Sequence, residues 1–388
     1  MSNKHVVAAL FEHYRAMRES QPVARDDVRD IWHVYRHADV QRVLSDYEVF
    51  SSDGVRMRTR VYGEGKGGGN PVGSIVRMDP PAHHAMRRAA NAVWSPQKQA
   101  ALEPTIRRLA EDLLDRVADA GKMDIVRDLS HPLPVAVMAE LMGIPADMRA
   151  SFRRWSSAVA TVQRELPAEE LAAAARELQQ MLAYFTDLAG ERQRRPADDL
   201  MSALLHHGEP MSTEVVISFC GLLVLAGNDT TTNLLGSMMV CFDDHPEVVA
   251  RLRANRTLVP SVIEEATRYY SPVKTSLRVT TQDTTLSGHH IPAGEILAPN
   301  ICSANRDDAE YPDGDRFDID RASKRHIAFG KGIHFCLGAP LARLEAQVML
   351  DAMLDRLPGT WRLADEPLAL IPSLIMFGFQ RIPMTWEP

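Results

Sequence analysis

The sequence predicts a mainly α protein with a minor β-sheet, because of the spacing of its apolar residues. Between Ser95 and His245 these residues recur at the i, i+3, i+4, i+7 spacing of one buried helix face. The run Ile106, Leu109, Ala110 and Leu113 is an example. Strand-like alternation is confined to the short stretches 31–35, 278–301 and 374–386. We therefore expect a small sheet at the periphery of a larger set of helices.

Start and stop signals place the main helices in order. Pro80 and Pro81 end an extended segment and start a helix. Residues 166–190, rich in Ala, Leu and Glu, predict a long helix, and the turn-forming RRPADD segment separates it from a helix at 200–205. The apolar segment 212–244 predicts a helix of about 45 Å, at ~1.5 Å per residue. Asp244 and Glu247 have the spacing of a capping box for the helix after it.

Composition limits the classes of partner and compartment. The 388 residues are 45% apolar, enough for a large core, and the length alone suggests two or three domains of about 100 to 200 residues. The net charge of −7 predicts neither nucleic-acid nor membrane binding. The first residues lack the apolar run of a signal peptide, and the apolar run 215–227 is too short for a bilayer. A cytoplasmic protein is expected.

The cysteine usage agrees with a reducing compartment. Cys220, Cys241, Cys302 and Cys336 are scattered, without a CxxC pair. This spacing indicates neither a disulfide framework nor a zinc or iron-sulfur site. An individual cysteine with a special function must therefore be identified from its surroundings.

Cys336 lies in such surroundings. Residues 329–345 read FGKGIHFCLGAPLARLE. Gly330 and Gly332 permit backbone conformations that other residues avoid, and the cysteine precedes a helix that begins near Gly338. Because a helix N-terminus favours negative charge and lowers the pKa of a thiol, the segment is suited to hold a thiolate. An isolated cysteine is otherwise more often an inert buried residue.

This segment closely resembles the signature FGxGxHxCxGxxLAxxE of the cytochrome P-450 superfamily. The matching residues are Phe329, Gly330, Gly332, His334, Cys336, Gly338, Leu341, Ala342 and Glu345. The resemblance implies the triangular, helix-rich P-450 fold as a single domain over residues 1–388. It implies haem b (iron protoporphyrin IX) as cofactor, with Cys336 as the axial iron ligand, Phe329 beside the cysteine loop and His334 at a propionate. An axial thiolate favours cleavage of the O–O bond.

A second match lies in the long apolar helix. Ala226 to Asn233 read AGNDTTTN, which resembles the family's AGxDT pattern. Gly227 lacks a side chain where a flat cofactor and dioxygen would lie. The resemblance implies that Thr230 hydrogen-bonds dioxygen or an ordered water and that Asp229 relays protons. The alternative is that Thr230 bonds to a carbonyl one turn earlier in the helix.

Further matches concern charged residues. Glu265 and Arg268 have the i, i+3 spacing at which helix side chains meet, and they match the family's ExxR motif. The resemblance implies a buried cluster completed by Arg316. By the same resemblance, His83, Arg87 and Arg278 contact the haem propionates, because arginine suits a carboxylate. Solvated surface charges are the alternative for each of them.

The function implied is a monooxygenase that inserts one oxygen atom of O2 into an apolar small molecule by hydroxylation or epoxidation. The Gly-rich stretch 62–70 lacks the strand-to-helix context of a nucleotide-binding loop, so the sequence indicates no dinucleotide site of its own. A separate ferredoxin-type donor with its reductase is therefore expected to supply the electrons. The protein itself is expected to be a monomer. A peroxide-driven peroxygenase would not need Asp229 and Thr230. A haem-based gas sensor or carrier would more naturally use a histidine ligand.

Position within the family also suggests where substrate and donor bind. The substrate pocket is expected to be lined by the loop 56–75, by Ala226, and by Val224, Val273, Lys274, Thr275, Ser276, Leu374, Ile375, Met376 and Phe377. Lys274 is either a partner for a substrate carboxylate or an exposed charge. The donor is expected to dock at basic residues on the cysteine side, namely His84, Arg88, Lys98, Lys331 and Arg343.

Overall fold

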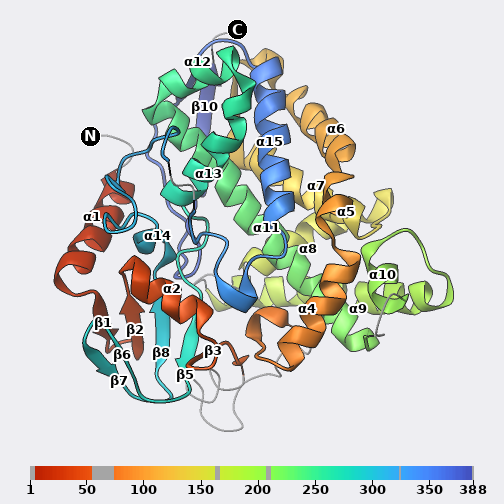
Figure 1. The fold of residues 1–388 in the computed structure, drawn as a ribbon. Coiled ribbons are helices and arrows are strands. Elements are labelled where there is room, and N and C mark those ends of the chain that lie inside the picture. Colours follow the sequence, from red (N-terminus) through yellow and green to blue (C-terminus); the bar gives the residue numbers. More distant parts are fainter. Residues whose placement is uncertain (1–4, 55–73, 162–166, 207–210, 323–324, 387–388) are drawn as a thin grey trace.

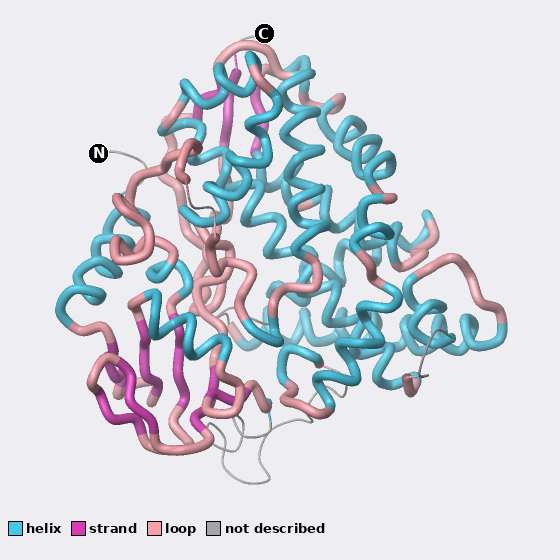
Figure 2. The backbone as a smooth tube through the Cα atoms, in the orientation of Figure 1, coloured by secondary structure: helices cyan, strands magenta, loops and turns pink. Residues whose placement is uncertain are grey.

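The computed structural model describes residues 5–54, 74–161, 167–206, 211–322 and 325–386. The α-helices are α1 (His5–Ser20), α2 (His37–Ser45), α4 (Ala82–Val93), α5 (Pro96–Ala100), α6 (Glu103–Leu114), α7 (Pro132–Leu141), α8 (Arg149–Thr161), α9 (Ala168–Arg194), α10 (Leu200–His206), α11 (Thr213–Asp244), α12 (Pro246–Ala254), α13 (Val259–Tyr269), α14 (Ile301–Ala304) and α15 (Ala339–Arg356). Short helical turns are η1 (Ile75–Arg77), η2 (Ala118–Ala120), η3 (Val126–Ser130), η4 (Ala146–Met148), η5 (Arg256–Leu258) and η6 (Gly332–His334). The mainly α class is confirmed, and the outline in Figure 2 is roughly triangular.

The strands form three small sheets rather than one. They are β1 (Val23–Asp26), β2 (Ile31–Val34), β3 (Phe50–Ser51), β4 (Lys122–Asp124), β5 (Arg278–Thr280), β6 (Thr284–Leu286), β7 (His289–Ile291), β8 (Ile296–Pro299), β9 (Trp361–Leu363) and β10 (Pro383–Trp386). The largest sheet has the order β1-β2-β8-β5-β3, in which only β2 and β8 are parallel, with Ile31 opposite Ile296. The order β4-β10-β9 forms a second, antiparallel sheet, and β6 pairs with β7. In Figure 2 the strands lie at the edges of the helical mass.

The strand expected at 374–386 is present only in its last part. Residues Pro383–Trp386 form β10, whereas Met376 makes a single bridge to Val273. Between these two, Phe379 makes another isolated bridge, to Leu370, and the Gly378 carbonyl accepts from the Ile371 N–H. The expected strand is therefore interrupted between Met376 and Pro383 rather than continuous.

The helix α11 runs through the centre of the fold beside α15 (Figure 1). It begins where expected, since the Ser212 hydroxyl caps it by accepting a hydrogen bond from the Val215 N–H. It contacts α7, α8, α9, α13 and α15. The predicted capping box after it is wrong: Asp244 is still helical, and the cap of α12 is His245, whose side chain makes no capping hydrogen bond.

Among the described residues, α11 is also the one helix long and apolar enough to cross a bilayer. The expectation that its apolar run is too short is therefore wrong. Only 44% of the residues in its most apolar window are buried. Many of the others line an internal cavity described below, so their exposure does not indicate contact with lipid. Packing on several sides identifies α11 as a core helix.

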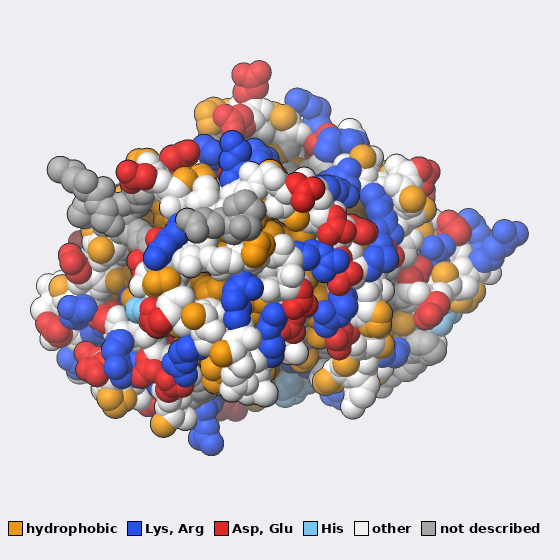
Figure 3. Space-filling model, turned by 90° about the horizontal axis from the view of Figure 1, so that it is seen from above, with side chains coloured by type: hydrophobic (Ala, Val, Ile, Leu, Met, Phe, Trp, Pro, Cys, Tyr) orange, Lys and Arg blue, Asp and Glu red, His pale blue; other side chains and the backbone are white. Residues whose placement is uncertain are grey.

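Among the described residues, two larger apolar cores and a small cluster of Ile31, Ile296 and Ala298 hold these elements together. The larger includes residues from Val7 to Trp386 and surrounds α11. The smaller lies under the five-stranded sheet and includes Val34, Phe50 and Leu297. On the face shown in Figure 3, acidic and basic side chains are interspersed.

Candidate active site

A cavity of about 280 Å³ lies between α11, α4 and the loop that precedes α15. It brings together most of the residues that the sequence suggested for cofactor binding. These are His83, Arg87, Ala226, Gly227, Thr230, Arg278, Phe329, Gly330, His334, Cys336 and Gly338. Segments far apart in the sequence therefore converge on one internal surface.

One face of α11 forms a wall of this cavity. The lining residues recur at helical spacing, namely Phe219, Leu222, Leu223, Ala226, Gly227, Thr230, Thr231 and Leu234. Val224 is off this face and is 1% exposed within the core, so its assignment to the pocket is wrong. Asp229 is half-buried and is also off the face.

The loop that carries Cys336 is closed by backbone geometry. Gly330 and Gly332 have φ angles of 78° and 68°, which only glycine adopts readily. A Cβ at Gly332 would also lie 2.8 Å from Ser45 Cα. The Cys336 N–H donates to the Phe329 carbonyl over 2.8 Å, and Phe329 lines the cavity. These contacts hold the cysteine at a fixed position.

The Cys336 sulfur is enclosed by protein but open to the cavity. The helix α15 begins beyond it as expected, and the N–H groups of Gly338 and Ala339 donate to the sulfur. Burial nevertheless raises the pKa of the thiol, and this effect outweighs those N–H groups and the Arg87 charge. The expected lowering of the pKa is therefore wrong for the protein alone. A metal ion at the sulfur would supply the missing positive charge and deprotonate it.

Basic side chains surround the rest of the cavity, and among the described residues no carboxylate lies within ion-pair distance of them. The rings of His83 and His334 are 4.4 Å apart, and both His83 nitrogens and His334 Nε2 are buried without a hydrogen-bond partner. Burial lowers the pKa of His83 to about 4 and that of His334 to about 3. Buried polar groups are normally satisfied, so these nitrogens indicate a ligand.

Two arginines complete this arrangement. Arg278 is 4% exposed and its Nη1 donates only to Ser276 and Leu277, while burial lowers its pKa to about 10. Among the described residues, neither Arg87 nor Arg278 has a carboxylate within ion-pair distance. Guanidinium groups bind carboxylates through paired hydrogen bonds. The residues therefore fit the two propionates of haem.

At Thr230 the structure shows a hydrogen bond within the helix, and at Gly227 it shows close packing against a neighbouring helix. The Thr230 hydroxyl donates to the Ala226 carbonyl over 2.7 Å, which is the back-bonded alternative, but its oxygen can still accept a hydrogen bond. A Cβ at Gly227 would lie 2.8 Å from Met138 Sδ. Gly227 thus allows close packing of α11 against Met138 of α7, and it also lines the cavity.

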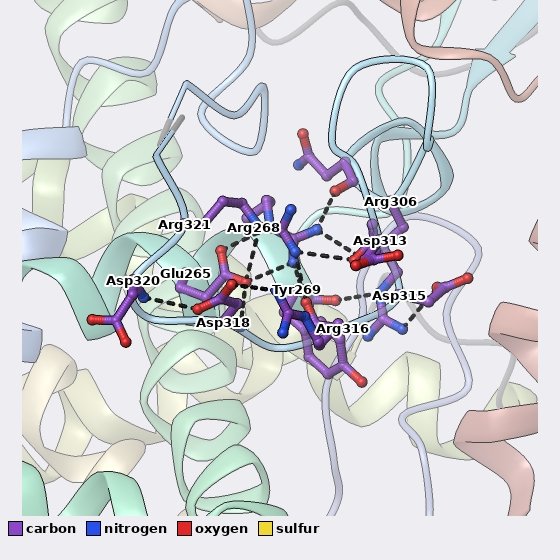
Figure 4. Close-up of polar contacts among 12 residues, drawn as sticks. Glu265, Arg268, Tyr269, Arg306, Asp313, Asp315, Arg316, Asp318, Asp320 and Arg321 are labelled. Carbon is purple, nitrogen blue, oxygen red and sulfur yellow. Dashed lines mark hydrogen bonds and ion pairs between the residues drawn. The ribbon is translucent and has the colours of Figure 1, made fainter.

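The expected buried charge cluster exists with one different member (Figure 4). Glu265 and Arg268 form a two-pronged ion pair at 2.7 and 2.8 Å, with both side chains 1% exposed. Arg316 is not the third member, because its side chain is 63% exposed and pairs with Asp318. Arg321 takes that place: its Nε lies 3.4 Å from Glu265 Oε1 and its side chain is 7% exposed. Only the backbone carbonyl of Arg316 joins the cluster, as acceptor from Arg268 and Arg321.

This cluster is connected to the cysteine loop by hydrogen bonds. Arg268 Nη1 donates to the Asn305 carbonyl over 2.7 Å, and the Asn305 side chain accepts from the Ile327 N–H over 2.9 Å. Ile327 precedes Phe329, whose carbonyl accepts from Cys336. The pair Glu265–Arg268 therefore positions the loop without reaching the cavity.

The predicted substrate residues divide between two cavities. Val273 and Ser276 line the cavity described above, together with Ile75 and Val76. Lys274, Thr275 and Leu374 line a different cavity. Ile375, Met376 and Phe377 are outside both linings, and Phe377 is 1% exposed and stacks on Tyr270. The assignment of these six residues to the first cavity is wrong, and residues 55–73 of the expected loop lie outside the described residues.

Some lining residues were not anticipated. Phe219, Leu222 and Leu223 could have been found by stepping back from Ala226 in turns of the helix. Glu345 is 1% exposed, lines the cavity, has an unpartnered Oε2, and burial raises its pKa to about 8. Its place in the signature gave no sign of this, because burial depends on how α15 packs.

The basic residues expected on the cysteine side are mostly accessible. His84, Arg88, Lys98 and Lys331 are exposed, and Lys331 also contributes to the cavity lining. Arg343 differs, because its Nε lies 2.6 Å from Glu264 and its guanidinium lies 4.4 Å above the Phe329 ring. Because its charge is paired with Glu264, Arg343 offers less unpaired positive charge than the other four residues.

Comparisons with known proteins agree with this geometry. The family model described as Cytochrome P450 matches residues 167–376. The chain is 38% identical over 355 residues to the cyclomarin C epoxidase CymV of Salinispora arenicola, an alignment covering 90% of this chain and 89% of that protein. It is 39% identical over 356 residues to the erythromycin C-12 hydroxylase of Saccharopolyspora erythraea, covering 90% and 87%.

Solved structures show the same similarity in three dimensions. The ligand-free cytochrome P450 TbtJ1 superposes with a TM-score of 0.89 at 39% identity, covering 98% of both chains. CYP109E1 from Bacillus megaterium in complex with corticosterone gives a TM-score of 0.88 at 35% identity, covering 97% of this chain and 98% of that one. The similarity thus extends over nearly the whole length.

Proposed function

This chain belongs to the cytochrome P450 family, and on that premise we propose which of its residues carry out the family's chemistry. It is a haem b monooxygenase, which uses O2, an organic substrate and electrons from a redox partner. Its named relatives are epoxidases and hydroxylases. For that reason neither a peroxygenase nor a gas sensor is favoured.

One observation carries the residue assignments: the Cys336 sulfur shares a cavity with the Ala226–Thr230 face of α11 and with basic side chains that have no ion-pair partner in the described part of the chain. Haem supplies the activation of dioxygen when bound. Cys336 would hold it through the sulfur, while His83, Arg87, Arg278 and His334 would bind its propionates. Ala226 and Gly227 would form part of the wall beside it.

Thr230 and Asp229 handle protons in this proposal. The Thr230 oxygen faces the cavity and can accept a hydrogen bond while its own proton is held by Ala226. It would orient a water molecule within the cavity. Asp229 is the next residue on the helix and is half-buried outside the cavity lining. In this proposal its carboxyl group passes protons toward the cavity.

We expect Thr230→Ala to separate electron use from product formation. General acid catalysis contributes about 10² to 10⁴ in rate, so product per NAD(P)H consumed should fall by at least about tenfold while hydrogen peroxide rises. The measurement is the ratio of product, peroxide and reductant consumed. Thr232→Ala is the matched control, because Thr232 lies on the same helix outside the cavity lining. Normal coupling in Thr230→Ala would contradict the role.

The substrate is an apolar small molecule that is hydroxylated or epoxidised. The lining that remains for it is apolar, consisting of Ile75, Val76, Phe219, Leu222, Leu223 and Val273. Apolar pockets with few polar groups bind by burying apolar surface. Two of the relatives support this class, namely the erythromycin C-12 hydroxylase and CYP109E1, which was crystallised with corticosterone.

A ferredoxin-type donor, reduced by its own reductase, supplies the electrons. It docks on a basic surface formed by His84, Arg88, Lys98 and Lys331, which are exposed on the cysteine side of the cavity. Opposite charges steer partners into contact.

Residues 1–388 form one domain in this proposal, because the larger core extends from Val7 to Trp386. The protein is a monomer and lies in the cytoplasm.

Charge reversal on this surface should slow electron transfer. We expect Arg88→Glu and Lys331→Glu to reduce the rate of haem reduction by an acidic ferredoxin, and to flatten its salt dependence. Screening shortens from ~10 Å at 0.1 M salt to ~3 Å at 1 M, so the effect should vanish at high salt. Lys122→Glu is the charge-matched control, because β4 pairs with β10 at the opposite end of the molecule from α4 (Figure 1). Wild-type rates and salt slopes in both variants would contradict the docking surface.

A further inference from the structure

Lys274 contributes to a second cavity of about 700 Å³. This cavity lies between α1, the strands β1 and β2, and the chain at 372–374. Val273 and Ser276 line the haem cavity, whereas Lys274 and Thr275 between them line the second one. The segment 273–276 is therefore a wall shared by two separate spaces.

The charges in the second cavity are balanced except at Lys274. Arg25 contacts Asp27 at 3.2 Å and Glu295 at 3.3 Å, and it also pairs with Asp30. Arg29 pairs with Asp26 at 3.0 Å. Among the described residues, Lys274 has no carboxylate within ion-pair distance. Because burial lowers the pKa of Lys274, a bound anion would stabilise its charged form.

A second polar group beside it also lacks a partner. Thr275 is 3% exposed, and its Oγ1 is buried without a hydrogen bond. Such a hydroxyl costs free energy unless something binds it. An ammonium and a hydroxyl on adjacent residues can both donate to one carboxylate group.

The other walls suit an apolar body. Leu10 and Met17 of α1 and the 43% exposed Leu374 supply aliphatic surface. The rings of His33 and Tyr35 stack at 6.0 Å on the β2 side. The volume is within the range of about 300 to 1,000 Å³ typical of small-molecule sites.

The backbone holds the polar pair in place. The Lys274 N–H donates to the Ile375 carbonyl and the Lys274 carbonyl accepts from the Ile301 N–H, both over 2.7 Å. Thr275 makes an isolated bridge to Asn300. Donors fixed in advance lose little entropy when a ligand binds.

We propose that this second cavity is a binding site for an organic carboxylate with an apolar or aromatic body, held by Lys274 and Thr275. The site is distinct from the haem cavity, and the proposal does not depend on the residue roles proposed there. If any of the haem-binding roles proposed above were wrong, the proposal for the second cavity would be unaffected.

The test measures binding of 3-phenylpropionate to the haem-loaded protein by calorimetry at pH 7. Binding is measured first without imidazole and then with saturating imidazole, which ligates the haem iron and so blocks the first cavity. We expect binding to persist, and the uncharged 3-phenylpropionamide to bind at least tenfold more weakly. Lys274→Gln should weaken 3-phenylpropionate at least tenfold, whereas the exposed, distant Lys122→Gln should leave it unchanged.

Thr275→Val provides a second variant that preserves shape. It should weaken binding several-fold without lowering the melting temperature, because no hydrogen bond within the protein is lost. Haem content and the absorption spectrum verify that each variant is folded. The proposal is overturned if 3-phenylpropionate does not bind, if imidazole abolishes binding, if the amide binds equally well, or if Lys274→Gln keeps the wild-type affinity.

Discussion

Cys336→Ser should abolish the thiolate-type spectrum of the ferrous carbon monoxide complex and reduce monooxygenase activity to background. A hydroxyl cannot replace the soft sulfur donor, and without an axial thiolate the O–O bond is not cleaved efficiently. The substitution is small, and the loop is held by its backbone, through the Phe329 carbonyl and the glycine conformations. The fold should therefore survive, which is checked by circular dichroism.

The other cysteines provide the control for this experiment. Cys220 is buried in α11, and burial raises the pKa of its thiol to about 12, so it acts as a small apolar residue. Cys220→Ala should keep the thiolate-type spectrum with a modest loss of stability. An unchanged spectrum in Cys336→Ser would exclude Cys336 as the ligand.

The sequence predicted α11 well because its signals are local. Ser212, the long apolar run and the AGNDTTTN segment all act through neighbours along one helix. Which face of that helix meets the cavity follows from the 3.6-residue period once Ala226 is placed there. Val224 is only two residues from Ala226 along the chain, but the same period places it on roughly the opposite side of the helix, within the core.

The errors concern contacts that depend on the path of loops. Arg316 and Arg321 both follow Glu265 at long range, and only the turn of the chain at 312–321 decides which guanidinium turns inward. Lys274 and Thr275 lie between two residues of the haem cavity, yet their side chains line the space on the other side. Neither outcome could be read from residue type or spacing.

The pKa of Cys336 depends on two opposing effects, burial and the helix N-terminus, and a sequence motif does not show which is larger. The helix N-terminus is present, and two N–H groups reach the sulfur. The cost of burying a charge depends on the whole enclosure, and it exceeds these local donors. The sequence thus predicted that the helix N-terminus lowers the pKa of the Cys336 thiol, but it did not predict that burial raises this pKa by more.

Glu265→Ala should prevent accumulation of stable haem-loaded protein. It removes both oxygens that bind Arg268, one of which, Oε1, also lies 3.4 Å from Arg321 Nε, and it leaves two guanidinium groups buried without this counter-charge. Breaking a buried pair typically costs about 3 to 5 kcal/mol, a large part of the stability of a domain of about 5 to 15 kcal/mol. Haem content per protein and the melting temperature measure this loss.

A matched pair of arginine variants distinguishes the cluster seen here from the one that the sequence suggested. Arg321→Ala should lower the melting temperature clearly, because it removes contacts to Glu265 and to the carbonyls of Pro312, Asp313 and Arg316. Arg316→Ala should change the free energy of unfolding by less than about 1 kcal/mol, as expected for an exposed pair with Asp318. Because Asn305 and Ile327 connect the cluster to the cysteine loop, Arg321→Ala should also lower haem retention while Arg316→Ala keeps it. Equal effects of the two substitutions, or full haem content in Glu265→Ala, would show that this network does not support the cysteine loop.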